Sequence, residues 1–229
     1  MEYISSNVAA APRCSIAAMR CYRLFFCTLK RYGDKCRWEM VEYCEKNDPV
    51  RGMHQPINSI TGLVFLVTAL KLSQGGRHEY GGMLIALAIS TFGVHASDNK
   101  DDFWKRADMA SMWAIVLTSL LHNLGAHASI PYIVAAAVML SMCTNALKLP
   151  PFIAVCAVWV LSFLPRCDPC IVAGYACFAI AFACWLLDVN GRCHPRSLLQ
   201  LHALWHLGSA AGFYFLLLRS KQVPAARAV

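Results

Sequence analysis

The sequence has few charged residues and especially few acidic ones. Of its 229 residues, 15% are charged and 13 are Asp or Glu, whereas a soluble globular domain carries about 25% charged residues. Apolar residues make up 58% of the chain, and its mean hydropathy is +0.46. This composition argues against a cytosolic globular enzyme, a disordered protein and a nucleic-acid-binding module. We therefore expect an integral membrane protein.

The chain is basic, with a formal net charge of +8, and such a charge raises nucleic acid as a partner. The basic residues, however, lie between long apolar runs, where they are typical of membrane-flanking charges. Several of the 12 cysteines lie inside apolar stretches and are expected to behave as small hydrophobic residues: Cys143, Cys156, Cys177 and Cys184. We expect no nucleic-acid partner, and the sequence leaves the oligomeric state open.

The long apolar runs lack the strict alternation of membrane β-strands, and their length suits helices, which need about 20 residues to cross a bilayer. The pattern predicts an all-α membrane protein, a seven-transmembrane helix bundle. The fifth segment is the shortest and is bounded by prolines; if it did not cross, every later segment would change sides. The predicted spans are Ile57–Ser73, Tyr80–Ala96, Ala107–Ala126, Ile130–Leu147, Pro151–Pro165, Cys170–Leu187 and Leu198–Leu218.

Four regions are predicted: a basic N-terminal tail (1–41), a short acidic segment (42–56), the bundle (57–218) and a basic C-terminal tail (219–229). Residues 1–33 hold five basic residues and a single acid, Glu2. That composition resembles a mitochondrial-type presequence or an amphipathic segment on the membrane surface. A solvated tail is the alternative.

Five polar residues interrupt the predicted spans, where polar groups are costly. Thr91 and His95 end the second span, Asp108 opens the third, and His202 and His206 begin the seventh. In a chain that crosses seven times, all five positions fall at similar depth on one side of the membrane. The N-terminal segment lies on that same side. The other histidines are expected to be interfacial residues.

Three imidazoles with an open fourth position are typical of a catalytic zinc site. Zinc polarises a carbonyl oxygen and lowers the pKa of its bound water to about 7. Asp108 would take up and deliver protons, and the hydroxyl of Thr91 would stabilise the developing oxyanion. The residues therefore predict hydrolysis of an acyl bond in a lipid. The alternative for Asp108 is a simple acid favoured at a helix N-terminus.

Several segments together resemble the alkaline ceramidase family, within a wider group of seven-span zinc hydrolases that includes adiponectin-receptor-like proteins. The similarity extends from about Glu42 to the end of the seventh span. It implies zinc at His95, His202 and His206 and hydrolysis of ceramide to a sphingoid base and a free fatty acid. The serine of that family falls at Thr91. The segments are Gln55-Pro56-Ile57-Asn58-Ser59, Thr91-Phe92-Gly93-Val94-His95, Lys105-Arg106-Ala107-Asp108 and His202-Ala203-Leu204-Trp205-His206.

The acidic run Glu42-Tyr43-Cys44-Glu45-Lys46-Asn47 resembles the calcium-binding stretch of the same family. The resemblance implies oxygen ligands from Glu42, the Tyr43 carbonyl, Glu45 and Asn47, a set that suits a hard cation. Gln55 falls where the family has a later Glu, which would weaken the site. A solvated acidic turn is the alternative. The resemblance also implies a disulfide between Cys44 and Cys193.

We therefore expect a zinc-dependent intramembrane amidase whose partner is the membrane lipid ceramide. Three alternatives stay open: a related hydrolase of another acyl lipid, a seven-span receptor with a structural zinc, and a transporter that relays protons. An endoplasmic reticulum or Golgi membrane is expected rather than the plasma membrane. The orientation is open, because the positive-inside rule places the N-terminal side in the cytosol and the family places it in the lumen.

Overall fold

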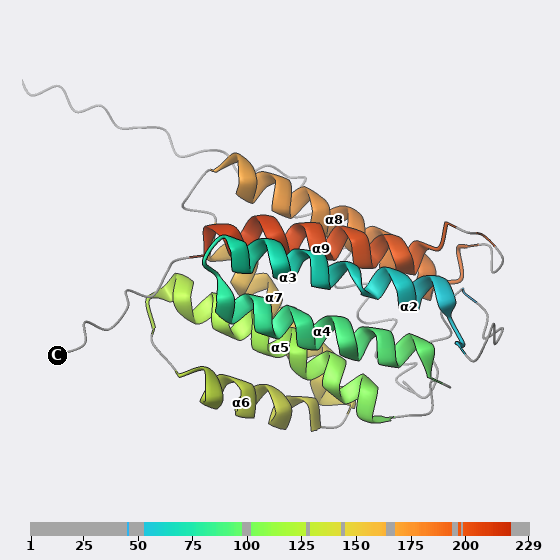
Figure 1. Cartoon of the computed structure of the whole chain (residues 1–229), viewed down its shortest axis with the longest axis horizontal. Coiled ribbons are helices and arrows are strands. Elements are labelled where there is room, and N and C mark those ends of the chain that lie inside the picture. The colour runs from blue at the N-terminus through green and yellow to red at the C-terminus, as the bar shows by residue number, and fades with distance from the viewer. Residues whose placement is uncertain are drawn as a thin grey trace, which may run out of the picture. The chain divides into compact units, whose positions relative to one another are not determined.

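The computed structural model describes Glu45 and residues 53–97, 102–126, 129–142, 145–163, 168–193, 197 and 199–220. Every regular element within these ranges is a helix (Figure 1), so the predicted all-α class is confirmed. The predicted N-terminal tail, residues 1–41, lies outside the described residues. The helices are α2 (Pro56–Gly62), α3 (Val64–Gln74), α4 (His78–Ala96), α5 (Asp102–Leu124), α6 (Ile130–Met142), α7 (Asn145–Leu161), α8 (Pro169–Val189) and α9 (Leu201–Arg219).

These helices occupy the predicted spans, with two differences. The first span is broken at Leu63 into α2 and α3. The fourth was predicted to reach Leu147, which is wrong: α6 ends at Met142, and α7 begins at Asn145. The predicted fifth span, Pro151–Pro165, consequently begins earlier, so that Pro150 and Pro151 lie inside α7, and it ends at Leu161.

Three stretches are long and apolar enough to cross a membrane: Pro56–Gln74, Pro169–Val189 and Leu201–Arg219. Large apolar side chains on α6 and α8 point outward, among them Tyr132 and Ile180, which are 78% and 65% exposed. Such faces suit a lipid surrounding better than water. The structure thus supports the predicted membrane character, whereas the count of seven crossings stays a prediction.

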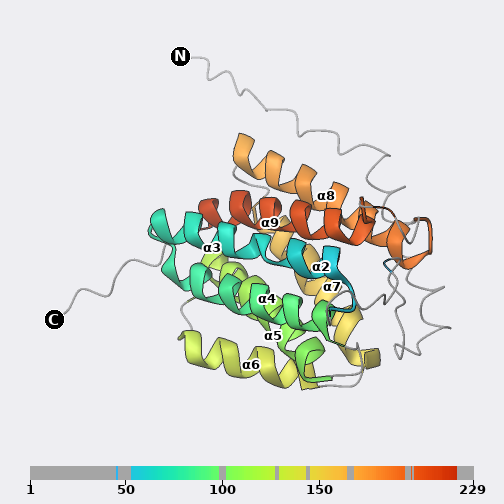
Figure 2. The same ribbon diagram turned by 45° about the vertical axis from the view of Figure 1, so that its right-hand side comes forward.

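The helices pack side by side in an order that differs from their order in the sequence. Helix α9 lies between α8 and the α2–α3 pair, α4 packs against α3 and α5, and α5 contacts both α6 and α7. Figures 1 and 2 show α8 and α6 on opposite sides of this group. Because α4 and α9 run in opposite directions along the bundle, the end of α4 and the start of α9 lie together.

The start of α2 is held by side-chain and backbone bonds. Both carboxylate oxygens of Glu45 accept backbone N–H groups, from Ile57 and Asn58, each at 2.9 Å. These N–H groups have no partner within a helix, and a negative charge is favourable there. Just before the helix, the backbone N–H of Gln55 donates to the carbonyl oxygen of His95 at 3.0 Å. The start of α2 is therefore fixed against the end of α4.

At the opposite end of the bundle, buried polar side chains form what we call the far-end network. The indole N–H of Trp159 donates to Ser119 Oγ at 2.8 Å, and Ser119 donates to Ser220 Oγ at 3.2 Å. Ser220 in turn donates to Asn123 Oδ1 at 3.3 Å. These bonds join α5 and α7 to the residue that follows α9.

Two further groups extend this network to α4. The hydroxyl of Tyr80 bonds to Ser220 Oγ at 3.0 Å and to His122 Nδ1 at 2.9 Å. The guanidinium of Arg77 donates to the carbonyl oxygens of Leu218 and Ser220, at 3.1 and 2.6 Å, which are among the carbonyls that a helix end leaves free. His122 thus lies far from the predicted zinc ligands, as expected.

We predict that Ser119→Ala destabilises the bundle, because the buried N–H of Trp159 would lose its acceptor. The expected loss is about 1–2 kcal/mol in the free energy of unfolding, measured by denaturant unfolding in detergent. Ser111→Ala is the matched control on the same helix, since that hydroxyl donates within its own helix, to the carbonyl oxygen of Ala107. Equal effects of the two substitutions would contradict the role of the network.

Candidate metal centre

Three of the predicted site residues, His95, His202 and His206, converge in the interior. One ring nitrogen from each lies within 4.8 Å of the corresponding nitrogens of the other two, and all three side chains are buried. Their ring centroids are separated by 4.7–5.1 Å. His95 lies in the last turn of α4, while His202 and His206 lie one turn apart at the start of α9. The predicted convergence of the imidazoles is thus confirmed.

The second nitrogen of each imidazole faces a polar side chain. Nδ1 of His95 lies 2.7 Å from Oε1 of Gln55, and Nδ1 of His202 lies 3.3 Å from Oδ2 of Asp188. The amide oxygen of Gln55 can only accept, so His95 carries its proton on Nδ1, and the negative carboxylate beside Nδ1 of His202 favours the same tautomer there. The lone pairs of these two rings are therefore on Nε2.

The third imidazole follows the same rule. Nδ1 of His206 lies 3.2 Å from Thr61 Oγ1. The Thr61 hydroxyl donates its own hydrogen to the carbonyl oxygen of Ile57 at 2.9 Å, so it acts as the acceptor towards His206. All three imidazoles are consequently held in one tautomer, as metal-binding histidines are held by their outer partners. Three Nε2 lone pairs remain to bind one ion.

This donor set fits a metal ion. Neutral imidazoles suit zinc and other first-row divalent cations, and a cation stabilises nitrogen lone pairs that point toward one position. The site is also removed from water, because each ring is buried. The centre can therefore hold a metal ion through His95, His202 and His206.

Asp188 is a site residue that was not predicted. It lies in the last turn of α8, its side chain is fully buried, and its carboxylate faces His202. Its signal in the sequence is a single acid near the end of an otherwise apolar segment. A buried acid in an apolar helix needs a partner. His202, at the start of α9, is that partner.

The turn after α8 brings Cys193 to Asp188, with Sγ 3.4 Å from the Oδ1 atom of the carboxylate. Cys193 is disulfide-bonded. Its predicted partner, Cys44, lies outside the described residues, so the pairing stays a prediction. The covalent bond limits the motion of the turn that carries the sulfur against Asp188.

Thr91 and Asp108 form a pair between α4 and α5. The hydroxyl of Thr91 donates to Oδ1 of Asp108 at 2.5 Å. Thr91 lies one turn before His95, on the same face of α4. Its neighbour Ser90 bonds to the carbonyl oxygen of Leu87 and also contacts the Asp108 carboxylate. Within the described ranges, the cluster that can hold a metal consists of the three histidines without Asp108, so this carboxylate is available for another task.

The predicted calcium ligands are described only in part. Glu42, Tyr43 and Asn47 lie outside the described residues. Both oxygens of Glu45 accept backbone N–H groups of α2. Oε1 of Gln55 accepts from His95 and from the side-chain amide of Asn58, the latter at 3.4 Å. The two described members thus bond to donors of this chain, and the calcium site stays a prediction.

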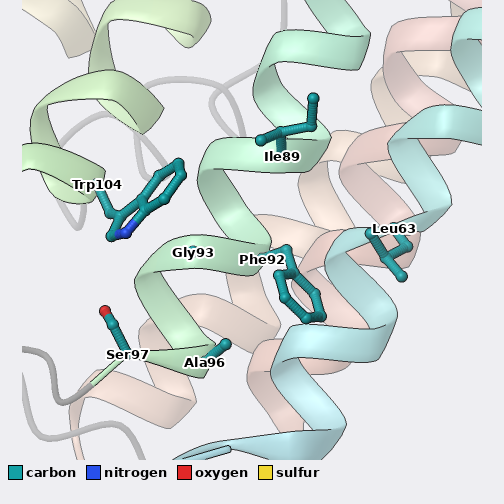
Figure 3. Close-up of a pocket in the computed structure, with 7 residues that line it drawn as sticks. All are labelled: Leu63, Ile89, Phe92, Gly93, Ala96, Ser97 and Trp104. Atoms are coloured by element: carbon teal, nitrogen blue, oxygen red, sulfur yellow. The ribbon is translucent and has the colours of Figure 1, made fainter.

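The other side of α4 carries an open pocket of about 490 Å³ (Figure 3). Its lining is almost wholly apolar, and the indole of Trp104 lies across Gly93, where a Cβ atom would come within 2.3 Å of the ring. The residues that α4 contributes to it alternate with Thr91 and His95, which point inward. The lining consists of Leu63, Ile89, Phe92, Gly93, Ala96, Ser97 and Trp104.

No family model, no curated protein and no solved structure matches this chain. A functional conclusion must therefore rest on the residues themselves and on the geometry of the metal centre.

We predict that Asp188→Asn weakens metal binding, because the amide removes the negative charge beside His202. Loss of such an outer partner typically lowers metal affinity about 10–100-fold, which competition with a chromophoric zinc chelator would measure. Asp168→Asn is the matched control, since Asp168 caps the other end of α8 and pairs with Arg219. Unchanged affinity in Asp188→Asn would contradict the assigned contact.

Proposed function

We propose that this chain is a zinc-dependent intramembrane amidase that hydrolyses ceramide to a sphingoid base and a free fatty acid. The observation that carries the proposal is the set of three buried imidazoles that could hold one ion, each with a polar side chain facing its Nδ1 atom. Next to His95 on α4 lies a hydroxyl–carboxylate pair, Thr91 and Asp108. Ligands and proton-transfer groups are what a hydrolytic metal site requires.

The proposal includes seven membrane crossings. Helices α4 and α5 have 19 and 23 residues, which is enough length for a bilayer of about 30 Å. They carry Thr91, His95 and Asp108, and these polar residues lower their mean hydropathy below that of α8. Helices α6 and α7 are apolar although shorter, and they pack against α5 within the same bundle.

Zinc bound by the three imidazoles supplies the Lewis-acid chemistry that activates an unreactive amide. The task of Asp108 is proton transfer: its carboxylate accepts a proton from the attacking water and delivers it to the departing amine nitrogen. Water and amide thus become acid and amine with no other reactant. Thr91 is buried and Asp108 is half-buried, which limits the access of competing solvent to the pair.

Thr91 changes partner during this cycle. In the structure its hydrogen is given to Asp108, which holds the carboxylate in place. Once Asp108 has taken up a proton, its oxygen is a weaker acceptor, and the Thr91 hydroxyl becomes free to donate to the developing negative oxygen of the substrate. Thr91 can serve both roles because it lies one helical turn from His95 on the same face of α4.

Ceramide is proposed over other acyl lipids because of the resemblance in the four motifs, and an endoplasmic reticulum or Golgi membrane is proposed with it. The metal centre itself suits any acyl bond that a lipid brings to its depth. Calcium is not needed for this proposal, since the oxygen of Gln55 already accepts from His95.

We predict that Asp108→Asn abolishes turnover while zinc stays bound, because the amide cannot accept a proton. The expected loss is on the order of 10²–10⁴-fold, measured as release of sphingoid base from defined ceramides by purified protein in detergent. His206→Ala should lose both zinc and turnover. Ser141→Ala is the control, because Ser141 is a buried hydroxyl of α6 that donates to the carbonyl oxygen of Val138 in its own helix.

The same assay separates the alternatives. Turnover of another acyl lipid, with the same dependence on Asp108, would replace ceramide as the substrate. Bound zinc whose removal unfolds the protein, with no turnover of any acyl lipid, would favour a receptor with a structural metal. Proton flux across sealed vesicles without hydrolysis would favour a transporter.

A further inference from the structure

Gly62, the last residue of α2, lies against Thr91. A Cβ atom at position 62 would lie 2.8 Å from Cγ2 and 3.3 Å from Cβ of Thr91, and real Cβ atoms do not approach other carbons so closely. Gly62 is itself buried. The missing side chain of Gly62 therefore leaves the space that the methyl group of Thr91 occupies.

The two substituents on Cβ of Thr91 have separate partners. The methyl group faces Gly62, while Oγ1 faces Asp108. Rotation about χ1 moves both together, and a β-branched side chain in a helix has few allowed rotamers. A group that displaces the methyl group therefore also turns the hydroxyl away from Asp108. Thr91 is 4% exposed, which leaves little room for any other adjustment.

Gly62 cannot easily move back from this contact. The preceding residue, Thr61, accepts from His206 and donates to the carbonyl oxygen of Ile57. The following residue, Leu63, separates α2 from α3, and its N–H donates to the carbonyl oxygen of Ile60. The backbone at Gly62 is thus fixed on one side by the metal centre and on the other by the turn between the helices.

We propose that Gly62 is a positioning residue that holds the Thr91 hydroxyl on Asp108, and that the glycine and the threonine methyl group are a matched pair. The inference rests on the proposed function, in which Thr91 and Asp108 act together. It gives a physical reason for threonine at a position where the family that the chain resembles has serine. The extra methyl group fills the volume beside a residue without a side chain.

The test is a set of four proteins: wild type, Gly62→Ala, Thr91→Ser and the double variant. Gly62→Ala should lower kcat on ceramide by about 10-fold or more, as small displacements of reacting groups do, with bound zinc unchanged. Thr91→Ser keeps the hydroxyl but loses the methyl group that restricts χ1, so its own kcat is the reference against which the double variant is compared. The double variant should recover to near the Thr91→Ser value, since the methyl group that meets the new Cβ is gone.

Gly82→Ala is the matched control. Gly82, like Gly62, lies in a helix, but that helix is α4, and a Cβ atom at position 82 meets nothing within 4 Å. Its substitution should leave kcat unchanged and stabilise the helix slightly. Wild-type kcat in Gly62→Ala, or a loss that Thr91→Ser does not relieve, would overturn the proposal.

A second double-mutant cycle tests the contact between Gly62 and Thr91 by thermal stability, without any assay of turnover. Thr91→Val removes the hydroxyl and keeps the shape, so in the wild-type background it should lower the thermal midpoint in detergent by about 2–4 °C. In the Gly62→Ala background the hydroxyl has already left Asp108, and the same substitution should cost less. Equal losses in both backgrounds would overturn the positioning role, even if ceramide proves not to be the substrate. If the wild-type protein hydrolyses no acyl lipid but the two losses in thermal midpoint differ, the proposed hydrolase activity is overturned. The matched pair of Gly62 and Thr91 is then retained.

Discussion

Each buried imidazole of the metal centre needs an acceptor for its Nδ1–H, and in a membrane-embedded interior only the protein can supply it. The three polar partners come from different parts of the chain: Gln55 precedes α2, Thr61 lies within α2, and Asp188 lies in the last turn of α8. The histidines themselves belong to α4 and α9. One requirement of hydrogen bonding thus brings four helices to the same place. Because the Nδ1 side of each ring faces one of these partners, the Nε2 lone pairs point toward one another.

The short helix α2 is the part of the fold on which the site depends most. Its seven residues are capped by Glu45 and end where α3 begins. Within α2, Thr61 faces His206 and Gly62 faces Thr91. This short helix therefore brings two adjacent residues to two different parts of the site.

The sequence predicted the helices and the convergence of the histidines because both depend on position along the chain. Apolar length locates a span, and counting crossings places His95 and His202 at the same end. The contacts that hold the site depend instead on rotation about each helix axis, which hydropathy does not determine. Asp188 and Thr61 were therefore not predicted, and Gln55 was assigned to calcium by resemblance although its oxygen faces His95. The break at Leu63 was also not predicted, because no proline marks it and the apolar run continues across it.

The polar groups at the two ends of the bundle differ in how they are bonded, and that difference separates a site from a structural network. In the far-end network, the hydroxyls of Ser119 and Ser220 each bond to other side chains of the same network. At the metal centre, three buried histidines bring ring nitrogens within 4.8 Å of one another, an arrangement that could hold a metal ion. Converging nitrogen lone pairs are stabilised by a cation placed among them. Helix α9 joins the two ends, since His202 and His206 lie in its first turns and Ser220 follows its last. The far-end network holds the C-terminal end of α9 in place. It thereby helps to keep His202 and His206, at the other end of the same helix, in position beside His95.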